Sequence, residues 1–594
     1  MEYPTLKDRI VHTILPRVQT PGQYIGGELN SVVKDHRRVS GTVCLAFPDT
    51  YAIGMSHHGL QVLYALMNRR DGWACERVFT PLADMERLLR EHELPLVSLE
   101  TYTPLGEFDV VGFSLQYELG ASNVLTMLDL GRIPLRAADR SLSDPLVIAG
   151  GPCAQNPEPM ARFIDLFVVG DGEESLPTVC DRWLEARAAC GNREEALAQL
   201  ASLPYVYVPR LHEPVYRDGA FVGMQPLRPD VPPLIRPAVL ADLDGTPLPT
   251  APVVPFVESV QDRIAIEIMR GCPWRCRFCQ ATTIKRPLRY RHVETIVQAA
   301  LESYAKTGYN EISLLSLSTS DYPLFDELMV RMREVFRPMD VAISIPSLRV
   351  NEQLQAVGAL LTTERRSGMT IAPEAARDDM RGQIGKPIKN DDLFKGCRAA
   401  FEQGFQRVKL YFMCGLPGER ESDLEGILEM AEIISRIGHE ARGRWPRVVA
   451  SVSNFVPKPH TPYQFRAMQS REYFQWAHDF LRRRRKFRNI DLKLHDVESS
   501  LLEGILSRGD RRTGAAIEEA WRKGARLDGW REHARYDLWH AAFEATGVGM
   551  DETVHREYAA EEILPWDHIA IRQGRYYLTR EHGRSITQLA GMGS

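Results

Sequence analysis

The stretch Glu267-Ile-Met-Arg-Gly-Cys-Pro-Trp-Arg-Cys-Arg-Phe-Cys-Gln280 carries three cysteines, Cys272, Cys276 and Cys279, at C-x3-C-x2-C spacing. An apolar, β-branched run over 264–269 precedes them and predicts a strand that ends in a glycine turn. A structural zinc site would need four ligands, usually as two separated pairs, and no second pair follows at a suitable distance. Three thiolates in one loop instead predict an iron–sulfur cluster that leaves one iron open to a substrate or cofactor.

This spacing, with the aromatic Phe278 directly before the last cysteine, resembles the signature of the radical S-adenosylmethionine (SAM) enzymes. The resemblance implies that Phe278 is a cofactor-binding residue at the SAM site. The resemblance implies that the three cysteines hold a 4Fe-4S cluster whose open iron chelates the amino and carboxylate groups of SAM. It also implies reductive cleavage of SAM to methionine and a 5'-deoxyadenosyl radical, which abstracts hydrogen from an unactivated C–H bond. The electron would come from a reductant such as flavodoxin or ferredoxin. Three reduced cysteines clustered by chance are the alternative, and the strand and glycine before the loop argue against it.

The composition is that of an ordinary soluble protein. Its 594 residues predict about three or four domains, and 44% hydrophobic with 25% charged residues is typical of globular folds. The formal net charge of -5 gives no global nucleic-acid signature. Residues 1–20 lack the apolar core of a signal peptide, and no stretch reaches the ~18 apolar residues of a membrane helix. Ten cysteines in so long a chain make no disulfide framework, so we expect a cytoplasmic protein without a membrane segment.

Residues 41–200 predict a doubly wound, parallel α/β sheet after a polar lead-in over 1–40. Short apolar runs, each ended by a proline, glycine, serine or charge, predict strands, and helical patterns lie between them. Such alternation predicts a parallel sheet with its ligands at the carboxyl ends of the strands. The predicted strands are 42–47, 109–115, 145–151 and 164–170.

The strand ends of this domain resemble those of the cobalamin-binding-type domain that precedes the radical core in one large branch of the radical SAM family. The matching motifs are Gly150-Gly151 and Gly170-Asp-Gly-Glu-Glu174, and the resemblance implies that Gly150 and Gly151 contact the cofactor. Other cobalamin domains place a histidine ligand in D-x-H-x-x-G, where this chain has Tyr51. We therefore expect no histidine on the cobalt, and cobalamin stays open as a third cofactor. If a corrinoid binds, we expect Tyr51 and the loop after Phe113 near the cobalt.

Four other side chains of this domain have plain structural interpretations. His57 and His58 are adjacent, so they point in different directions on a helix, and we expect a surface or capping role for them. Cys44 lies inside an apolar strand and is interpreted as a small hydrophobe. Cys153 stands at a strand end and could face a cleft, although a structural role is the simpler interpretation.

Nine prolines from Pro226 to Pro255 predict a semi-rigid linker within 201–257, which would hold the first domain at a fairly fixed distance from the core. The core follows over 258–465. Six predicted strands separated by helical patterns indicate the partial (β/α)6 barrel expected of radical SAM cores, with its chemistry at the carboxyl-terminal face. These strands are 264–269, 311–317, 341–345, 368–372, 407–413 and 448–454.

The resemblance to radical SAM cores also implies which strand ends contact SAM. It places the small residues Ser316 and Ser318 beside the methionine part of SAM, and Glu374 where a carboxylate accepts from the amino group or ribose. It places Gly415 and Leu416, which open the segment Gly-Leu-Pro-Gly-Glu, beside the adenine, where the backbone must come close. A plain turn is the alternative interpretation of the glycines.

Residues 466–594 predict a small, mostly helical C-terminal domain. Its motifs Gly509-Asp-Arg-Arg512 and Leu564-Pro-Trp-Asp-His568 resemble the tail of a little-described radical SAM family with a cobalamin-domain-like N-terminal half. Six positive residues within 482–488 could neutralise the phosphates of an RNA, but Phe487 stands alone as an aromatic residue for base stacking. Because such a run is more often a solvated helix face, we favour a small-molecule or peptide-sized substrate over RNA.

The leading hypothesis is a radical SAM enzyme for C–H functionalisation or methyl transfer, acting as a methyltransferase, mutase or oxidoreductase on an unidentified substrate. One alternative is an RNA-modifying radical SAM enzyme. Another is a non-catalytic iron–sulfur or electron-transfer protein, which would normally complete its cluster with a fourth cysteine. Neither Cys397 nor Cys414 has the local spacing for this, although Cys414 ends a predicted strand and could reach the cleft. A methylthiotransferase is disfavoured, because it needs three further cysteines on N-terminal strand ends and only Cys153 stands at one.

Overall fold

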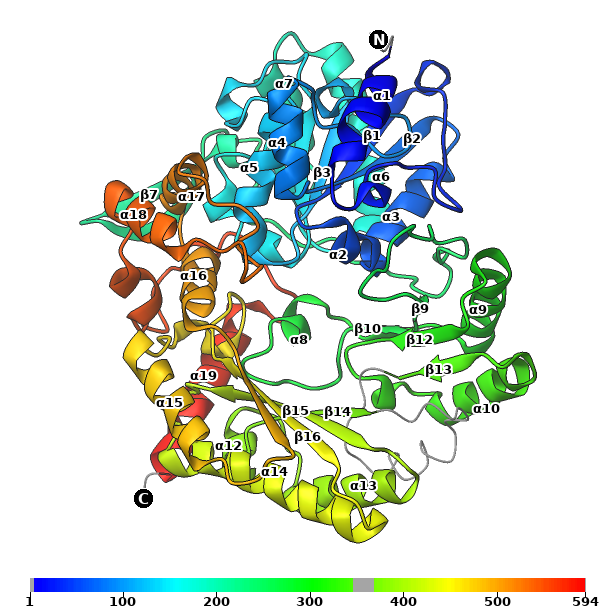
Figure 1. Cartoon of the computed structure of the whole chain (residues 1–594). Helices are drawn as coiled ribbons and strands as arrows, with labels where there is room; N and C mark the ends of the chain where they lie inside the picture. The colour runs from blue at the N-terminus through cyan, green and yellow to red at the C-terminus, as the bar shows by residue number, and fades with distance from the viewer. Residues whose placement is uncertain (1–4, 346–367, 593–594) are drawn as a thin grey trace.

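The computed structural model describes residues 5–345 and 368–592. An N-terminal doubly wound sheet lies above two parallel sheets of the core, and the helices of the C-terminal region pack along one side of both (Figure 1). This arrangement confirms the predicted fold class. None of the helices in the described ranges combines the length and the hydrophobicity that a membrane span needs.

The N-terminal sheet has the strand order β2-β1-β3-β4-β5-β6. The first five strands pair in parallel, and β6 runs antiparallel to β5. The strand order reverses between β1 and β3, so the loops that follow these two strands diverge and open a crevice at the carboxyl edge. The four predicted strands are confirmed. The strands are β1 (Gly41–Phe47), β2 (Trp73–Phe79), β3 (Val110–Ser114), β4 (Leu146–Gly150), β5 (Leu166–Val168) and β6 (Val206–Tyr207).

Helices cover both faces of this sheet, and each strand is buried on both sides. One apolar cluster joins α4 and α5 to the face that carries Cys44 and Val111, and a second joins α3, α6 and α7 to the face that carries Leu45 and Ile148. Cys44 is fully buried, as its interpretation as a small hydrophobe requires. The helices are α2 (Tyr51–Met55), α3 (His58–Asn68), α4 (Ala83–Glu91), α5 (Ala121–Leu130), α6 (Gly172–Ala189) and α7 (Arg193–Ala201).

Strand β2 was not predicted, because Glu76 and Arg77 interrupt its apolar pattern. Arg77 is nevertheless buried, and its guanidinium donates to Glu100 at 2.6 Å and to Glu28 at 3.1 Å. Two carboxylates thus compensate a charge that the sheet takes out of water. Glu28 comes from the segment predicted as a polar lead-in, and Ile10 in the same segment is fully buried. The lead-in is therefore part of the packed domain, which corrects that prediction.

The segment predicted as a linker also packs against its neighbours. It contains the hairpin β7 (His212–Arg217)–β8 (Ala220–Pro226), and beyond it Ile235 and Leu240 are buried among the prolines. Isolated bridges join Leu29 to Val254 and Ile235 to Ile569. The prolines therefore do not form an extended spacer, because the apolar residues between them anchor the segment to both ends of the chain.

The core contains two parallel sheets, with the strand orders β13-β12-β9 and β14-β15-β16-β17. The six predicted strands are confirmed, and β17 is a seventh that lies beyond residue 465, where the core was expected to end. The helix expected between strands 341–345 and 368–372 falls on 346–367, outside the described residues. The strands are β9 (Ile264–Glu267), β12 (Glu311–Leu315), β13 (Ala342–Ser344), β14 (Met369–Glu374), β15 (Arg407–Cys414), β16 (Arg447–Asn454) and β17 (Ile490–Leu494). The helices are α9 (Val293–Thr307), α10 (Phe325–Phe336), α12 (Asp378–Gln383), α13 (Asn390–Glu402) and α14 (Glu421–Arg442).

Two motifs noted in the sequence hold the C-terminal region against the first domain. Arg511 donates to the carboxylate of Glu158 in the first domain at 2.8 Å, and His568 lies 3.4 Å from the same carboxylate. Glu158 and His568 are buried, so this contact fixes the first domain against the C-terminal region. The helices here are α15 (Arg471–Arg484), α16 (Val497–Arg508), α17 (Thr513–Arg522), α18 (Tyr536–Thr546) and α19 (Gly574–Met592).

Two buried histidines predict how stability depends on pH. Burial lowers the pKa of His460 and of His478 to about 4, so both stay neutral in the folded protein. The unfolded chain binds these protons near pH 6.5, so stability is fully present above that pH and falls as the pH drops from 6.5 towards 4. Urea unfolding of the apoprotein at pH 7.5, 6 and 5 should show this loss, and a His478→Asn variant should show a shallower dependence. A parent whose unfolding free energy is flat across this range would contradict the assignment.

Candidate functional site

The cysteine loop begins and ends at a short antiparallel pair. Strand β10 (Met269–Arg270) pairs with β11 (Arg289–Tyr290), and α8 (Ala281–Ile284) lies between the loop and β11. Gly271 opens the loop at φ +90°, and a Cβ there would lie 2.8 Å from the carbonyl oxygen of Lys285. The predicted strand and glycine turn are confirmed, and only glycine fits at the turn.

The three thiols of the loop are shielded from solvent. Cys272 and Cys276 are each 7% exposed, and Cys279 is half-buried. Burial and the nearby Cys272 thiol raise the pKa of Cys279, so a bound metal would be needed to stabilise its thiolate. No group of three His, Cys, Asp or Glu side chains within 5–345 and 368–592 is arranged to hold a single metal ion.

Hydrogen bonds through Asp321 connect the start of the cysteine loop to the segment that follows strand β12. The indole of Trp274 donates to Asp321 at 2.7 Å, and the hydroxyl of Ser318 donates to the same carboxylate at 2.5 Å. Ser316 shares a hydrogen bond with the hydroxyl of Thr319 at 2.9 Å. The structure thus places Ser316 and Ser318 beside the cysteine loop, and their contact with SAM stays a prediction.

A cavity of about 660 Å³ separates the first domain from the core. Residues at both ends of the cysteine loop, Gly271 and Ala281, line it, and so do the predicted Gly150, Gly151 and Ser316. Its wall on the first domain is an apolar slot between the sheet and helices α3 and α6. The slot residues are Leu45, Leu60, Leu63, Gly112, Ile148, Val168 and Leu176.

The wall on the core side is charged. Arg270 lies 2.7 Å from Glu267, 2.5 Å from Glu173 and 3.1 Å from Asp171, so strand β10 is tied to the first turn of α6. Burial opposes ionisation of Glu267, but the hydrogen bond from Arg270 and the positive charges of Arg270 and Arg291 together outweigh it and hold the pKa of Glu267 below its usual range. Lys285 also lines the cavity, and its ammonium has no hydrogen bond or ion pair among the described residues. An anionic group in the cavity would complement it.

His57 and His58 both line the cavity, and the capping role expected for them is confirmed for His57. The Nδ1 of His57 accepts from the backbone N–H of Leu60 at 3.1 Å and caps α3, and burial lowers its pKa to about 4. The Nε2 of His58 is buried without a partner among the described residues, so His58 is not a surface residue. Tyr51 does not line the cavity and donates instead to the buried Glu28 at 3.0 Å. The expectation that Tyr51 would lie near the cobalt of a bound corrinoid does not suit this position, because the short helix α2 turns Tyr51 into the core.

The loop after Phe113 lines the cavity through Ser114 and Gln116, and its position near a cobalt stays a prediction. Gln116 donates to the hydroxyl of Ser114 at 2.9 Å. Next to this loop, Gly151 has φ +100°, and a Cβ there would lie 2.5 Å from the carbonyl oxygen of Leu115. The backbone after β4 therefore approaches the end of β3 too closely for any side chain.

The ends of β14 and β15 lie near the loop but are held by protein contacts. Glu374 has φ +67° and pairs with Lys386 at 3.0 Å. Gly415 has φ +81°, and its backbone N–H donates to Glu419, whose pKa burial raises to about 7. This contact gives Gly415 a turn role, and its role beside adenine, like the SAM contact of Glu374, stays a prediction.

Phe278 and Leu416 lie in one apolar cluster behind the loop, so the structure brings together two residues that the sequence placed at SAM. Cys414 is fully buried, and its thiol lies 3.4 Å from the side-chain oxygen of Asn454. Alternate residues of β15 are buried against the helices, and Cys414 is one of them. Cys414 therefore faces away from the barrel interior and not towards the cleft. Cys397 is buried in α13.

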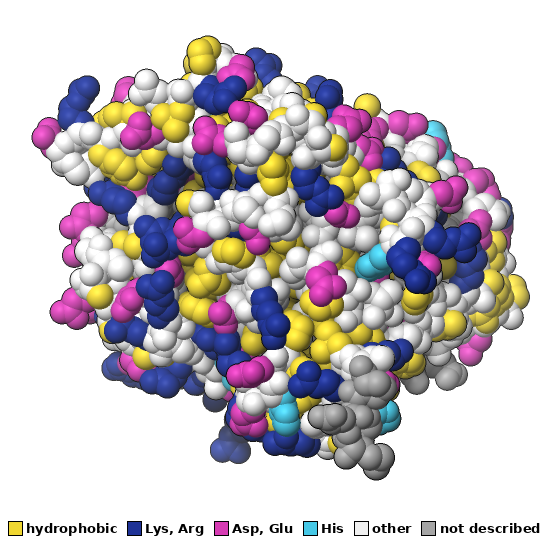
Figure 2. All heavy atoms as spheres, turned by 90° about the horizontal axis from the view of Figure 1, so that it is seen from above, with side chains coloured by type: hydrophobic (Ala, Val, Ile, Leu, Met, Phe, Trp, Pro, Cys, Tyr) yellow, Lys and Arg dark blue, Asp and Glu magenta, His cyan; other side chains and the backbone are white. Residues whose placement is uncertain are grey.

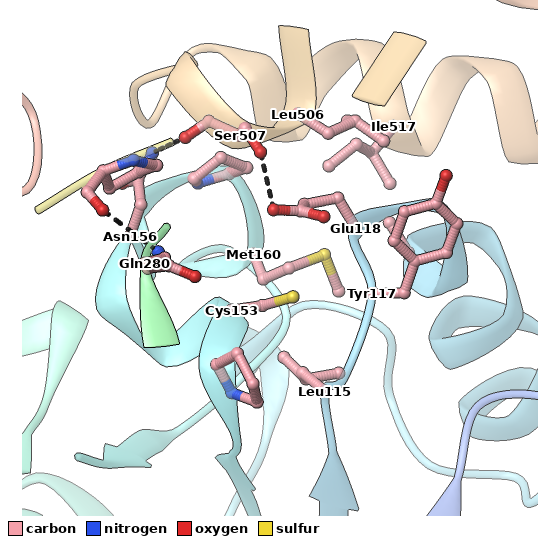
Figure 3. A pocket seen from close by; sticks show the side chains of 14 residues that line it. Leu115, Tyr117, Glu118, Cys153, Asn156, Met160, Gln280, Leu506, Ser507 and Ile517 are labelled. Atoms are coloured by element: carbon pink, nitrogen blue, oxygen red, sulfur yellow. Dashed lines mark hydrogen bonds between the residues drawn. The ribbon is translucent and has the colours of Figure 1, made fainter. Parts of the chain in front are cut away.

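Cys153 lines a separate small cavity of about 30 Å³ between β3, β4, the loop exit at Gln280 and helix α16. Figure 3 shows its sulfur beside that of Met160, with Glu118 hydrogen-bonded to Ser507 across the cavity. Burial raises the pKa of the Cys153 thiol well above its usual value, so it stays protonated. This environment agrees with the structural interpretation of Cys153.

The basic run at 482–488 is a solvated helix end. Arg482 pairs with Asp479 at 2.8 Å, and Arg484 pairs with Glu425 at 2.7 Å and Glu421 at 3.3 Å. The ion pairs of Arg482 and Arg484 favour the structural interpretation of the run.

On the opposite part of the molecule, the face of the first domain seen from above, basic and acidic side chains are interspersed (Figure 2).

Sequence reasoning missed the charged wall of the cavity. Arg270 stands inside the cysteine motif and Glu173 inside a motif of the first domain, yet nothing in their spacing shows that they meet. Lys285 follows the last cysteine by six positions and carries no motif signal. The contact between the two domains was needed to find Arg270 and Glu173, and the cavity between the domains was needed to find Lys285.

Comparisons with known proteins match two segments. Residues 59–209 match a family model described as radical SAM proteins, N-terminal, and residues 266–431 match the radical SAM superfamily, so together the matches span more than half of the chain. An uncharacterized protein of Methanocaldococcus jannaschii is 28% identical over 426 residues, which cover 71% of this chain and 82% of that protein. The ribosomal protein uS12 methylthiotransferase RimO of Moorella thermoacetica is 25% identical over 279 residues, which cover 44% of this chain and 62% of RimO.

Among solved structures, the radical S-adenosylmethionine methyltransferase TsrM of Kitasatospora setae, with cobalamin and a 4Fe-4S cluster bound, aligns with a TM-score of 0.46 and 15% identity. That alignment covers 72% of this chain and 76% of TsrM.

Proposed function

Because the chain belongs to the radical SAM superfamily, we propose that it is an enzyme that cleaves SAM at a 4Fe-4S cluster held by Cys272, Cys276 and Cys279. The observation that carries this proposal is the position of the cysteine loop. Its three thiols are sheltered from solvent, and both of its ends line the cavity between the two domains. When bound, the cluster and SAM supply the electron and the 5'-deoxyadenosyl radical for C–H chemistry.

The residues around the loop position and shelter this chemistry. Asp321 fixes Trp274 and so fixes the start of the loop. Arg270 joins the core to the first domain through the carboxylates of Asp171 and Glu173, and it also pairs with Glu267 of the core. Lys285 holds an anionic group of a bound ligand in place. Exclusion of water by these walls protects a radical from side reactions.

We propose that the apolar slot of the first domain takes the nucleotide tail of a corrinoid, which makes methyl transfer the best supported reaction. The slot lies between the sheet and helices α3 and α6, and Gly112 leaves one of its walls without a side chain. Gly150 and Gly151 at the end of β4 let a ligand approach the backbone. Ligand pockets typically measure roughly 300–1,000 Å³, and the cavity of about 660 Å³ falls within the range of a small-molecule site.

Anaerobic reconstitution with iron and sulfide tests the proposal. The loaded protein should contain one 4Fe-4S cluster, and on reduction it should release 5'-deoxyadenosine and methionine from SAM. Its EPR spectrum should change when SAM is added, because the open iron is the proposed SAM site. If protein that contains a full complement of cluster shows no change in its EPR spectrum when SAM is added, and cleaves no SAM, the enzyme assignment is rejected.

The pairing of the basic run predicts weak, non-specific binding of RNA. Bulk tRNA should bind the parent and a variant with Arg482→Gln, Arg483→Gln, Arg484→Gln and Arg485→Gln with the same affinity within about twofold across a salt series. The physical reason is that carboxylates already neutralise Arg482 and Arg484. Tight binding by the parent that the variant loses, with a shallower salt slope, would restore the RNA-modifying alternative.

A further inference from the structure

Helix α19 lies outside the segment that matches the radical SAM superfamily, yet it packs against the cysteine loop. In Figure 1 it is the red helix between α8, α12 and α15. Its neighbours include α12 and the short turn Pro462–Phe465 that follows strand β16. The helix therefore covers the side of the loop opposite the cavity.

The main contact runs through Arg277, which stands between the second and third cysteines. Arg277 is 5% exposed, and its guanidinium donates to the carbonyl oxygen of Gln383 at 2.6 Å and to the side chain of Gln588 at 2.5 Å. It also lies 3.6 Å from the carboxylate of Glu581. Its Nε is buried without a partner among the described residues, so one donor remains available beside the cysteines. Two of its three partners belong to α19.

Apolar packing gives a second contact. Met592 packs with Phe278 and Leu416 in the cluster behind the loop. Leu589 lies so close to the chain that a Cβ at Gly418 would be 2.2 Å from it, and Gly418 has φ +77°. The helix therefore meets both the cysteine loop and the segment after β15.

A third contact passes through α12. The side-chain amide of Gln383 donates to the hydroxyl of Ser585 at 2.9 Å, and the backbone N–H of Arg277 donates to the carbonyl oxygen of Ile384 at 2.9 Å. The guanidinium of Arg275 also lies 5.8 Å from the ring centre of Tyr577. Loop, α12 and α19 thus form one hydrogen-bonded unit.

We propose that α19 is a structural part of the cluster site and that Arg277, held by Gln588 and Glu581, is a positioning residue for the segment between Cys276 and Cys279. This inference rests on the proposed function, because it concerns how the cluster is held. A buried guanidinium that loses its partners is costly, so without α19 the segment would rearrange to expose Arg277. Its positive charge, carried by the residue that follows Cys276, also favours the reduced, more negative state of a cluster, since nearby charge tunes reduction potentials.

The test compares the parent with Arg277→Met, Arg277→Lys, Gln588→Ala and the matched control Thr587→Ala. Thr587 neighbours Gln588 on α19 but is exposed and bonds only within the helix, to Gly583. Each protein is reconstituted anaerobically and measured for iron release to a chelator, for the EPR spectrum of the reduced cluster with and without SAM, and for midpoint potential. Thermal unfolding of the apoproteins shows whether each variant folds.

We expect Arg277→Met and Gln588→Ala to release iron several-fold faster than the parent and to alter the SAM-dependent EPR change. Arg277→Met should also make the potential more negative, and Arg277→Lys, which keeps the charge, should restore it. Because Gln588 is exposed, Gln588→Ala should fold even if Arg277→Met does not. Iron release and spectra in Gln588→Ala that equal those of Thr587→Ala would overturn the inference. If the parent itself held no cluster, the proposed function would fail as well, so the two failures are distinguishable.

Discussion

Replacing Cys272 with alanine is expected to abolish reductive cleavage of SAM. Two thiolates cannot hold the cluster that three hold, so iron content should fall sharply, and release of 5'-deoxyadenosine should drop to the level without enzyme. The fold should survive, because the loop lies at a cavity rim and only one small side chain is lost. The measurements are iron and sulfide content after anaerobic reconstitution, 5'-deoxyadenosine by chromatography, and circular dichroism of the apoprotein.

The chain offers a matched control for this experiment. Cys153 is another cysteine near the domain interface, half-buried where Cys272 is buried, and it lies in the separate small cavity with Met160. Cys153→Ala should keep the cluster and the cleavage of SAM. A Cys272→Ala protein that still releases 5'-deoxyadenosine on reduction would reject the ligand assignment.

Replacing Gly112 with leucine should block the apolar slot and weaken corrinoid binding roughly 10- to 100-fold, because overpacking costs about 1–3 kcal/mol. A Cβ at Gly112 would lie 3.5 Å from Ile148 and 3.6 Å from Leu45, which are ordinary contacts, so a longer side chain would extend into the slot. Cleavage of SAM in the absence of substrate should continue, since the cysteine loop is on the other wall. Equilibrium binding of cobalamin, followed by its visible absorption, measures the effect.

Gly112→Ala is the control, because one methyl group fits between the two neighbours without displacing them. It should bind cobalamin within about threefold of the parent, well inside the ~1.4 kcal/mol that a tenfold change requires. Equal binding by the leucine variant and the parent would place the corrinoid outside the slot. A parent that retains no corrinoid would leave the slot for another apolar group and would remove methyl transfer as the best supported reaction.

Local pattern was enough to predict much of the fold. The four strands of the first domain and the six of the core are apolar runs of strand length, and burial in a parallel sheet favours that pattern without help from distant residues. Strand β2 was not predicted, because Glu76 and Arg77 interrupt its run of apolar residues. The charge of Arg77 is tolerated only because Glu28 and Glu100, far away in the chain, meet it. The proline-rich segment was misjudged for a similar reason, since Ile235 is held by a strand-like contact to Ile569.

The residues of the candidate site also fall into those that the sequence indicated and those that only the tertiary structure revealed. The sequence by itself determined the three cysteines of the cluster loop and the glycine turn before them, because a loop of eight residues must bring its own ligands together. The resemblance of its motifs to cobalamin-binding-type domains and to radical SAM cores also indicated Gly150, Gly151 and Ser316, which follow strands of two different sheets. Only the tertiary structure decided that Arg270 meets Asp171 and Glu173 of the first domain and that α19 holds Arg277. The physical reason is that these contacts form between segments separated by about a hundred residues or more, and no local periodicity specifies which distant surfaces will pack together.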